Sequence, residues 1–140
     1  MDSDSDKGAG TVLVIDDSDV SRGEMMRLLT NAGLEVVGLA SPIGATRVIL
    51  TTNVKVVVID VLMPSMRGDR LAALFRGNPR MNAMGVVLVS GENASELSRL
   101  ADDVQADAAV SKLNLAELVP AVKRAMAVRE ARSRPPFRNV

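Results

Sequence analysis

The sequence has no cysteine, no histidine, no tryptophan and no tyrosine, and each absence excludes a class of function. Without cysteine there is no disulfide framework, thiolate nucleophile or cysteine-ligated metal. Without histidine there is no histidine metal ligand, no Ser-His-Asp triad and no phosphohistidine on this chain. Two phenylalanines are too few aromatic side chains for a base-stacking nucleic-acid surface. Chemistry must therefore come from carboxylates, hydroxyls, lysine, arginine, backbone groups or a hard metal bound by oxygen.

Charge of one sign and long hydrophobic runs are also missing. Lys plus Arg and Asp plus Glu both number 17, so the net charge is zero and gives no attraction to nucleic acid. No run reaches the roughly 20 apolar residues of a membrane span, and residues 1–10 lack the apolar stretch of a signal peptide. We expect a cytoplasmic protein without a membrane or nucleic-acid partner. Its 140 residues suit one domain over 11–130, between a disordered leader, 1–10, and a flexible tail, 131–140.

Short apolar runs alternate with helical segments along the chain. The runs at 11–16, 55–60 and 85–90 are continuous and rich in β-branched residues, as in strands buried on both faces. A second strand is expected at 35–40 and a weak fifth strand at 108–111. Helices are expected from about 19 to 31, from 41 to 50, over 69–75 and 94–104, and from an Asn114 cap to about 129, where Pro120 bends or restarts the last one. This pattern predicts an α/β fold: a doubly wound, five-stranded parallel sheet of order 2-1-3-4-5, flavodoxin-like (βα)5.

Polar side chains follow four of the five predicted strands. They are Asp16 and Asp17 after the first, Asp60 at the end of the third, Ser90 at the end of the fourth and Lys112 past the fifth. In open α/β sheets the ligand crevice lies outside the carboxyl ends of the strands. With strands 1 and 3 adjacent, the three carboxylates converge on one spot, flanked by the serine and the lysine.

Three carboxylates within a few ångströms repel one another, so they raise their pKa values or recruit a cation. Oxygen ligands of this kind suit Mg²⁺. The metal and Lys112 could neutralise the oxygens of a phosphoryl group, and Ser90 could donate a hydrogen bond to one of them. Asp60 could then attack phosphorus and form an aspartyl phosphate.

Over about residues 10–130 the chain resembles the receiver domain of bacterial two-component response regulators, of the stand-alone, chemotaxis-receiver kind. The matching pieces occur in the family's order, each at a strand end. They are Val-Ile-Asp16-Asp17-Ser, Val-Val-Val-Ile-Asp60-Val-Leu-Met63-Pro64 with Gly68, Val-Leu-Val-Ser90-Gly91 and Ala106-Asp107-Ala-Ala-Val-Ser-Lys112. The resemblance implies a receiver that is not an enzyme and that signals by protein–protein interaction.

The resemblance also implies a role for each polar residue. Asp60 looks like the phosphoacceptor, Ser90 like the hydroxyl that binds the phosphoryl oxygen, and Lys112 like the phosphoryl-binding lysine. For Mg²⁺ it implies direct ligands from Asp17, Asp60 and the Leu62 backbone carbonyl, with Asp16 acting through water. The implied partners are a histidine kinase or histidine phosphotransfer protein as donor and a downstream protein target. The chain is expected to be a monomer or weak dimer.

Three positions depart from the family's pattern. Ala109 stands where tyrosine or phenylalanine is usual, Leu113 where proline usually follows the lysine, and Gln105 where glycine often precedes Ala-Asp. The first two favour an alternative, a pseudo-receiver that acts as a phosphorylation-independent adaptor. A third hypothesis, an aspartyl-phosphate phosphatase, would resemble enzymes with an Asp-x-Asp strand end, whereas Val61 and Leu62 follow Asp60 here.

Overall fold

The computed structural model describes residues 10–91 and 93–133. The rest of the predicted leader, 1–9, and residues 134–140 of the predicted tail lie outside the described residues. Five parallel strands form one sheet in the order β2-β1-β3-β4-β5, which confirms the predicted topology. Their bounds are Thr11–Ile15 (β1), Glu35–Leu39 (β2), Val54–Asp60 (β3), Gly85–Ser90 (β4) and Ala108–Ser111 (β5).

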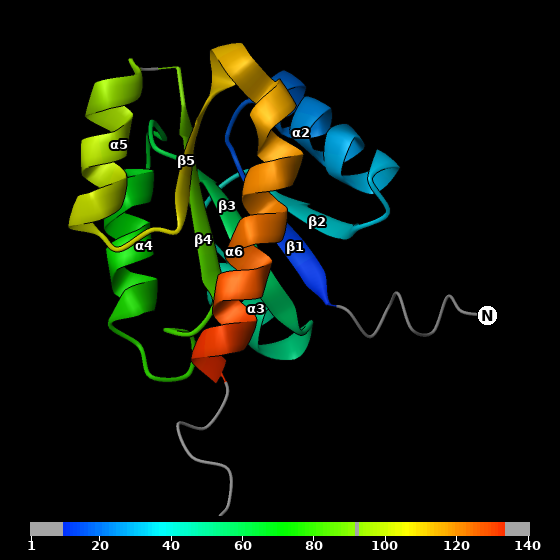
Figure 1. Cartoon of the computed structure of the whole chain (residues 1–140), viewed down its shortest axis with the longest axis vertical. Helices are drawn as coiled ribbons and strands as arrows, with labels where there is room; N and C mark the ends of the chain where they lie inside the picture. The colour runs from blue at the N-terminus through cyan, green and yellow to red at the C-terminus, as the bar shows by residue number, and fades with distance from the viewer. Residues whose placement is uncertain (1–9, 92, 134–140) are drawn as a thin grey trace, which may run out of the picture.

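The helices lie between the strands in sequence and on both faces of the sheet in space. They span Asp19–Asn31 (α2), Ala45–Thr51 (α3), Gly68–Arg76 (α4), Ala94–Asp103 (α5) and Leu118–Ser133 (α6), with a 3₁₀ segment, η1, over Lys112–Glu117. Figure 1 shows α6 crossing in front of the sheet. No helix in the described part of the chain combines the length and apolarity needed to cross a membrane.

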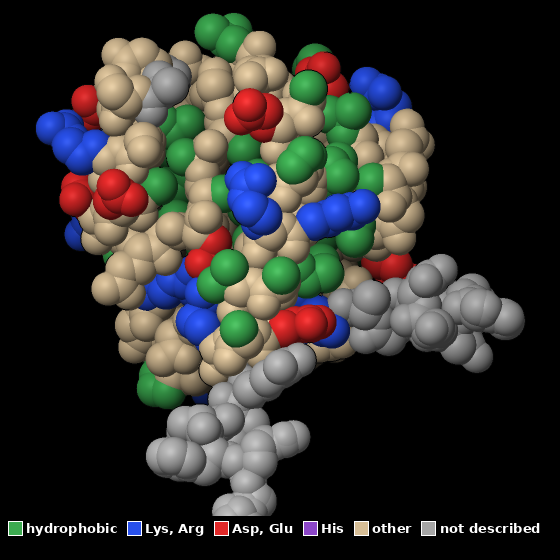
Figure 2. Space-filling model, viewed as in Figure 1, with side chains coloured by type: hydrophobic (Ala, Val, Ile, Leu, Met, Phe, Trp, Pro, Cys, Tyr) green, Lys and Arg blue, Asp and Glu red, His purple; other side chains and the backbone are tan. Residues whose placement is uncertain are grey.

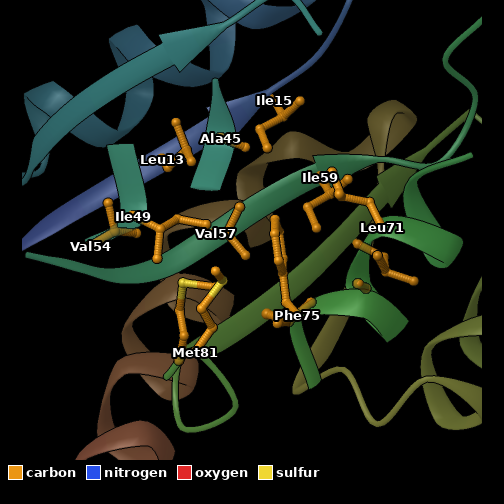
Figure 3. Close-up of a cluster of buried hydrophobic side chains, with 14 of the residues drawn as sticks. Leu13, Ile15, Ala45, Ile49, Val54, Val57, Ile59, Leu71, Phe75 and Met81 are labelled. Carbon is orange, nitrogen blue, oxygen red and sulfur yellow. The ribbon is translucent and has the colours of Figure 1, made fainter. Parts of the chain in front are cut away.

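Each face of the sheet has its own core. One cluster packs α3, α4 and α5 against residues such as Leu13, Val57 and Leu88. Figure 3 shows Leu13 and Val57 among its side chains. The other packs α2 and α6 against alternate positions of the same strands, such as Val12, Val58 and Val87. The central strands are covered on both sides, which explains their continuous apolar runs. This double burial leaves the strand ends as the place where polar groups can meet solvent.

Two helix starts differ from the prediction. A helix from Ser41 was expected, but α3 begins at Ala45, because Gly44 has a left-handed φ of +88° that a helix cannot include. Asn114 was expected to cap the last helix, and this is wrong. Its φ of −140° interrupts the 3₁₀ segment, and α6 begins at Leu118. Pro120 then lies in the first helical turn, where its missing N–H costs no hydrogen bond. The helix continues to Ser133, so the first three residues of the predicted tail are helical.

The backbone at Gln105 explains why glycine is often found at this position in the family, because its φ is +60°. This left-handed conformation costs a non-glycine residue roughly 1–2 kcal/mol, whereas glycine adopts it freely but loses about 0.5–1 kcal/mol in chain entropy. We therefore expect Gln105→Gly to raise the free energy of unfolding by up to about 1 kcal/mol. Urea unfolding measures the change. Gln105→Ala, which keeps the β-carbon, is the control and should give no gain; an equal gain from alanine would contradict the backbone explanation.

Candidate functional site

The three aspartates meet at the carboxyl ends of β1 and β3. These strands are hydrogen-bonded neighbours in which Ile15 pairs with Ile59, so Asp16 and Asp60 follow the same register position. One carboxylate oxygen from each of Asp16, Asp17 and Asp60 lies within 4.8 Å of the others. The convergence expected from the strand order is therefore present.

The aspartates differ in exposure and in their local contacts. Asp16 is fully buried and Asp60 is 3% exposed, while Asp17 is exposed. The Ser18 backbone N–H donates to Asp16 Oδ1 over 2.9 Å, in the turn that leads into α2. The Leu62 N–H lies 3.4 Å from Asp60 Oδ1, after the strand has ended. Two carboxylates are thus held by the backbone, and the third faces solvent beside them.

Lys112 supplies a positive charge to this cluster from across the sheet. It is the first residue after β5, and its Nζ lies 2.9 Å from Asp16 Oδ2 and 3.4 Å from Asp60 Oδ2. The Ser111 hydroxyl accepts a hydrogen bond from the Leu113 N–H and so shapes the turn that carries the lysine. Leu113, which replaces the usual proline, is exposed and does not keep Lys112 from the aspartates.

Burial and like charge act together on Asp60. Its pKa is raised from 3.8 to about 6, first because burial disfavours the charged form and then because Asp16 is negative. For Lys112, burial opposes the charged form, but hydrogen bonds and charge attraction from the two aspartates outweigh it and raise its pKa. For Asp16, burial alone would raise the pKa, but the hydrogen bond from the Ser18 N–H and the other donors outweigh it, so the pKa is lowered. At neutral pH the cluster therefore holds charged carboxylates beside a charged lysine.

Ser90 and Gly68 complete the site from two further elements. Ser90 ends β4, is fully buried and pairs with Ser111 of β5. Gly68 starts α4, and its N–H donates to the Val61 carbonyl over 2.8 Å. A β-carbon on Gly68 would lie 2.1 Å from the Asp60 carbonyl oxygen, so only glycine lets this helix approach β3 so closely.

Arg22 is a neighbour of the site that the sequence interpretation missed. Its guanidinium donates to the Asp16 backbone carbonyl over 2.8 Å and forms an ion pair with Asp19 at 2.7 Å. The spacing of three residues between Asp19 and Arg22 on a predicted helix indicates the ion pair. The contact with the Asp16 carbonyl depends on how α2 packs beside β1, which the sequence pattern does not specify.

Ala109 lies beside a hollow on the face formed by β5 and α5. The hollow has a volume of about 320 Å³. Its lining includes Leu97, Ala109 and Ser111, together with Asn114 and Glu117 of the 3₁₀ segment η1. The small side chain at position 109 contributes to this open space at the sheet edge. An aromatic residue there would fill part of it.

Comparisons with known proteins agree with this geometry. The family model described as the response regulator receiver domain matches residues 12–123. A protein-glutamate methylesterase/protein-glutamine glutaminase of Thiobacillus denitrificans is 40% identical over 106 residues, covering 72% of this chain and 29% of that protein. Protein PilG of Pseudomonas aeruginosa is 28% identical, covering 59% of this chain and 61% of PilG. The chain thus spans less than two thirds of the length of these curated relatives.

Solved structures show the same fold. A CheY-like response regulator receiver domain protein from Methanospirillum hungatei JF-1 superposes with a TM-score of 0.75 at 22% identity, covering 89% of this chain and 98% of that one. A two-component response regulator of the LuxR family from Aurantimonas sp. SI85-9A1 gives 0.74 at 26% identity, covering 84% and 85%. The five-stranded architecture is therefore the one found in receiver domains.

Proposed function

The chain belongs to the response regulator receiver domain family, and from this membership we propose that it accepts a phosphoryl group on Asp60. The donor would be a histidine kinase or a histidine phosphotransfer protein, and the readout would be binding to a downstream protein. The observation that carries the proposal is that Lys112 Nζ contacts both Asp16 and Asp60 at the carboxyl ends of the strands. This arrangement supports the proposal, because a carboxylate that could act as the nucleophile lies beside a cation that could bind the phosphoryl oxygens.

The donor set fits Mg²⁺. Three ionised carboxylates and one ammonium leave a net charge of −2, which favours a divalent cation with a preference for oxygen. Asp17 and Asp60, joined by the Leu62 carbonyl, would hold the ion directly, and Asp16 would act through water. When bound, the ion would offset charge on the phosphoryl oxygens.

Asp60 would act as the nucleophile. Its pKa of about 6 leaves the carboxylate ionised at neutral pH. A carboxylate oxygen forms the new bond to phosphorus while the P–N bond of the donor's phosphohistidine breaks, and that electron pair stays with the departing imidazole. Lys112, already within 3.4 Å of Asp60, would bind a phosphoryl oxygen as the charge moves onto this chain.

Ser90 would connect the modification to the surface. An acyl phosphate carries a charge of about −1.5 to −2, where the carboxylate carried −1, and the buried hydroxyl of Ser90 can donate to a phosphoryl oxygen. Ser90 is paired with Ser111 of β5, and Ser111 caps the turn that carries Lys112. A shift of Ser90 would therefore reach β5 and α6, which we propose as the face that a downstream target binds. We propose a signalling role rather than an enzymatic one, in a monomer or weak dimer.

The proposal is tested by intact-protein mass after incubation with acetyl phosphate and Mg²⁺. We expect one adduct of about 80 Da on the natural chain and none on Asp60→Ala. Asp103→Ala, which removes an exposed carboxylate from α5, is the matched control and should be modified normally. A chelator should prevent the reaction. An adduct that persists in a folded Asp60→Ala variant would refute the assignment of the phosphoacceptor.

A second candidate, a phosphorylation-independent adaptor, is favoured by one observation. Ala109 leaves the hollow beside β5 open. The chain therefore has no aromatic side chain at position 109 that could carry a signal from Ser90 to the surface. If the folded chain takes no adduct and also binds no beryllofluoride, the adaptor is the better description. The intact set of Asp16, Asp17, Asp60 and Lys112 favours the phosphorylated receiver.

A further inference from the structure

A second hollow lies at the amino ends of the central strands, opposite the end of the sheet that carries Asp60. It is bounded by the end of α3, the first residue of β3, the connection between α4 and β4, and the last turns of α6. We call it the arginine hollow; its lining includes Ile49, Val54, Arg80, Met81, Met84 and Arg129. Its volume is about 260 Å³, just below the roughly 300–1,000 Å³ found for sites of drug-sized ligands. It therefore suits a small molecule.

The floor of the arginine hollow is apolar. Ile49, Val54, Met81 and Met84 are buried members of the core that packs α3, α4 and α5 on the sheet. Figure 3 shows Ile49, Val54 and Met81 close together at one end of this cluster. A ring or short hydrocarbon chain placed here would contact core side chains and leave water. Methionine side chains adapt their shape, which helps such a floor accept a ligand.

The rim of the arginine hollow is positively charged. Arg80 lies in the α4–β4 connection and Arg129 near the end of α6, and no acidic residue lines the hollow within the described part of the chain. Arg80 forms no ion pair with any described residue. A guanidinium has five N–H donors, so it can keep an existing contact and still bind an anion.

The surroundings strengthen this positive charge. A neighbouring hollow shares Ala83 and is lined by Arg76 and Arg132. Both of these arginines pair with Asp107, so two cations face one carboxylate there. Figure 2 shows Lys and Arg side chains beside the lower part of α6, with acidic side chains among them. The edge of the sheet around the arginine hollow therefore carries an excess of positive charge.

We propose that the arginine hollow binds a small organic anion whose carboxylate or sulfonate group meets Arg80 and Arg129 while its apolar body lies on Met81 and Met84. The pairing of a guanidinium rim with an apolar floor selects for both properties in one molecule. The site is separate from the phosphoacceptor, because it lies at the amino ends of β3 and β4 and Asp60 lies at the carboxyl end of β3. Binding here would add a second input to the same fold.

The test uses the full chain with ¹³C-labelled methionine methyl groups and naphthalene-2-sulfonate as the probe. We expect saturable shifts of the Met81 and Met84 methyl signals, with no shift of Met25, which packs in the core on the other face. Sulfate alone and the neutral analogue 2-naphthol should each bind at least tenfold more weakly. Arg80→Gln combined with Arg129→Gln should weaken the probe at least tenfold, and Arg99→Gln, an exposed arginine on α5, should not.

Several results would overturn the proposal. Equal affinity for 2-naphthol would mean that the hollow is only apolar, and equal affinity for sulfate would mean that the floor contributes nothing. Absence of shifts at Met81 and Met84 would mean that the hollow does not bind such anions. An unchanged Met25 signal and thermal midpoint show that the double variant is folded. If it does not fold, Arg80→Gln alone, at an exposed loop position, must still weaken binding.

Discussion

Replacing Asp107 with asparagine is expected to lower the free energy of unfolding by about 3–5 kcal/mol, because it leaves two arginines facing a neutral group. Asp107 Oδ2 lies 2.9 Å from Arg76 Nη2, and Oδ1 lies 2.9 Å from Arg132 Nη1. The Asp107 side chain is 9% exposed, and that of Arg76 is 11% exposed. Asp107 also accepts a hydrogen bond from the Val86 N–H. The carboxylate therefore ties α4, β4 and the end of α6 together at one buried point.

The measurement is urea unfolding followed by circular dichroism. Asp103→Asn makes the same chemical change at an exposed position only four residues away, and its effect should stay within about 0.5 kcal/mol. Arg132→Gln should cost about 1 kcal/mol, since Arg132 is 32% exposed and water screens its charge. If Asp107→Asn were as stable as Asp103→Asn, the ion pairs would contribute nothing measurable to the fold.

The sheet could be predicted from the sequence because its signals are local. A continuous apolar run such as Val56–Ile59 has one explanation in a small α/β protein, a strand covered on both faces. The order of the strands then places Asp16 and Asp60 together, since parallel neighbours end at the same edge. Position alone was therefore enough to predict the acidic cluster.

Contacts that depend on helix packing could not be predicted in this way. Arg132 reaches Asp107 because α6 continues to Ser133, beyond the end that the helical pattern suggested near Arg129. The start of α6 also moved from Asn114 to Leu118, because the turn after Lys112 is a 3₁₀ segment. The partner of Arg132 therefore comes only from the structure. The contact of Arg22 with the Asp16 carbonyl also needed the structure, because it depends on how α2 packs beside β1.

Asp60→Asn is expected to stabilise the metal-free protein at pH 8 by about 2–3 kcal/mol while abolishing phosphorylation. In the natural chain the Asp60 side chain is 5% exposed and shares Lys112 with the buried Asp16. One ammonium faces two buried carboxylates, so the free-energy cost of burying the second carboxylate exceeds its attraction to Lys112. Asparagine keeps the shape of the side chain and removes the excess negative charge.

The sign of the pH dependence follows from the direction of the shift. The folded-state pKa of Asp60, about 6, lies above the ordinary value of 3.8, so the folded protein binds this proton more tightly than the unfolded chain does. The contribution of Asp60 to the stability of the natural protein therefore falls as the pH rises from about 4 to about 6, and it is lost above that range. The advantage of Asp60→Asn should be full at pH 8, should shrink below pH 6 and should vanish near pH 4.

The comparison needs urea unfolding of both proteins at several pH values in the presence of a chelator, with the exposed Asp102→Asn as control. Adding Mg²⁺ should then stabilise the natural chain more than the asparagine variant, because the variant lacks one of the proposed ligands. A variant that is less stable than the natural chain at pH 8 without metal would show that Lys112 compensates both aspartates. The cluster would then be a structural ion-pair network. We expect the variant to be more stable without metal and the natural chain to gain more stability from Mg²⁺. This result is expected of a site in which stability is lost so that a cation and a phosphoryl group can bind.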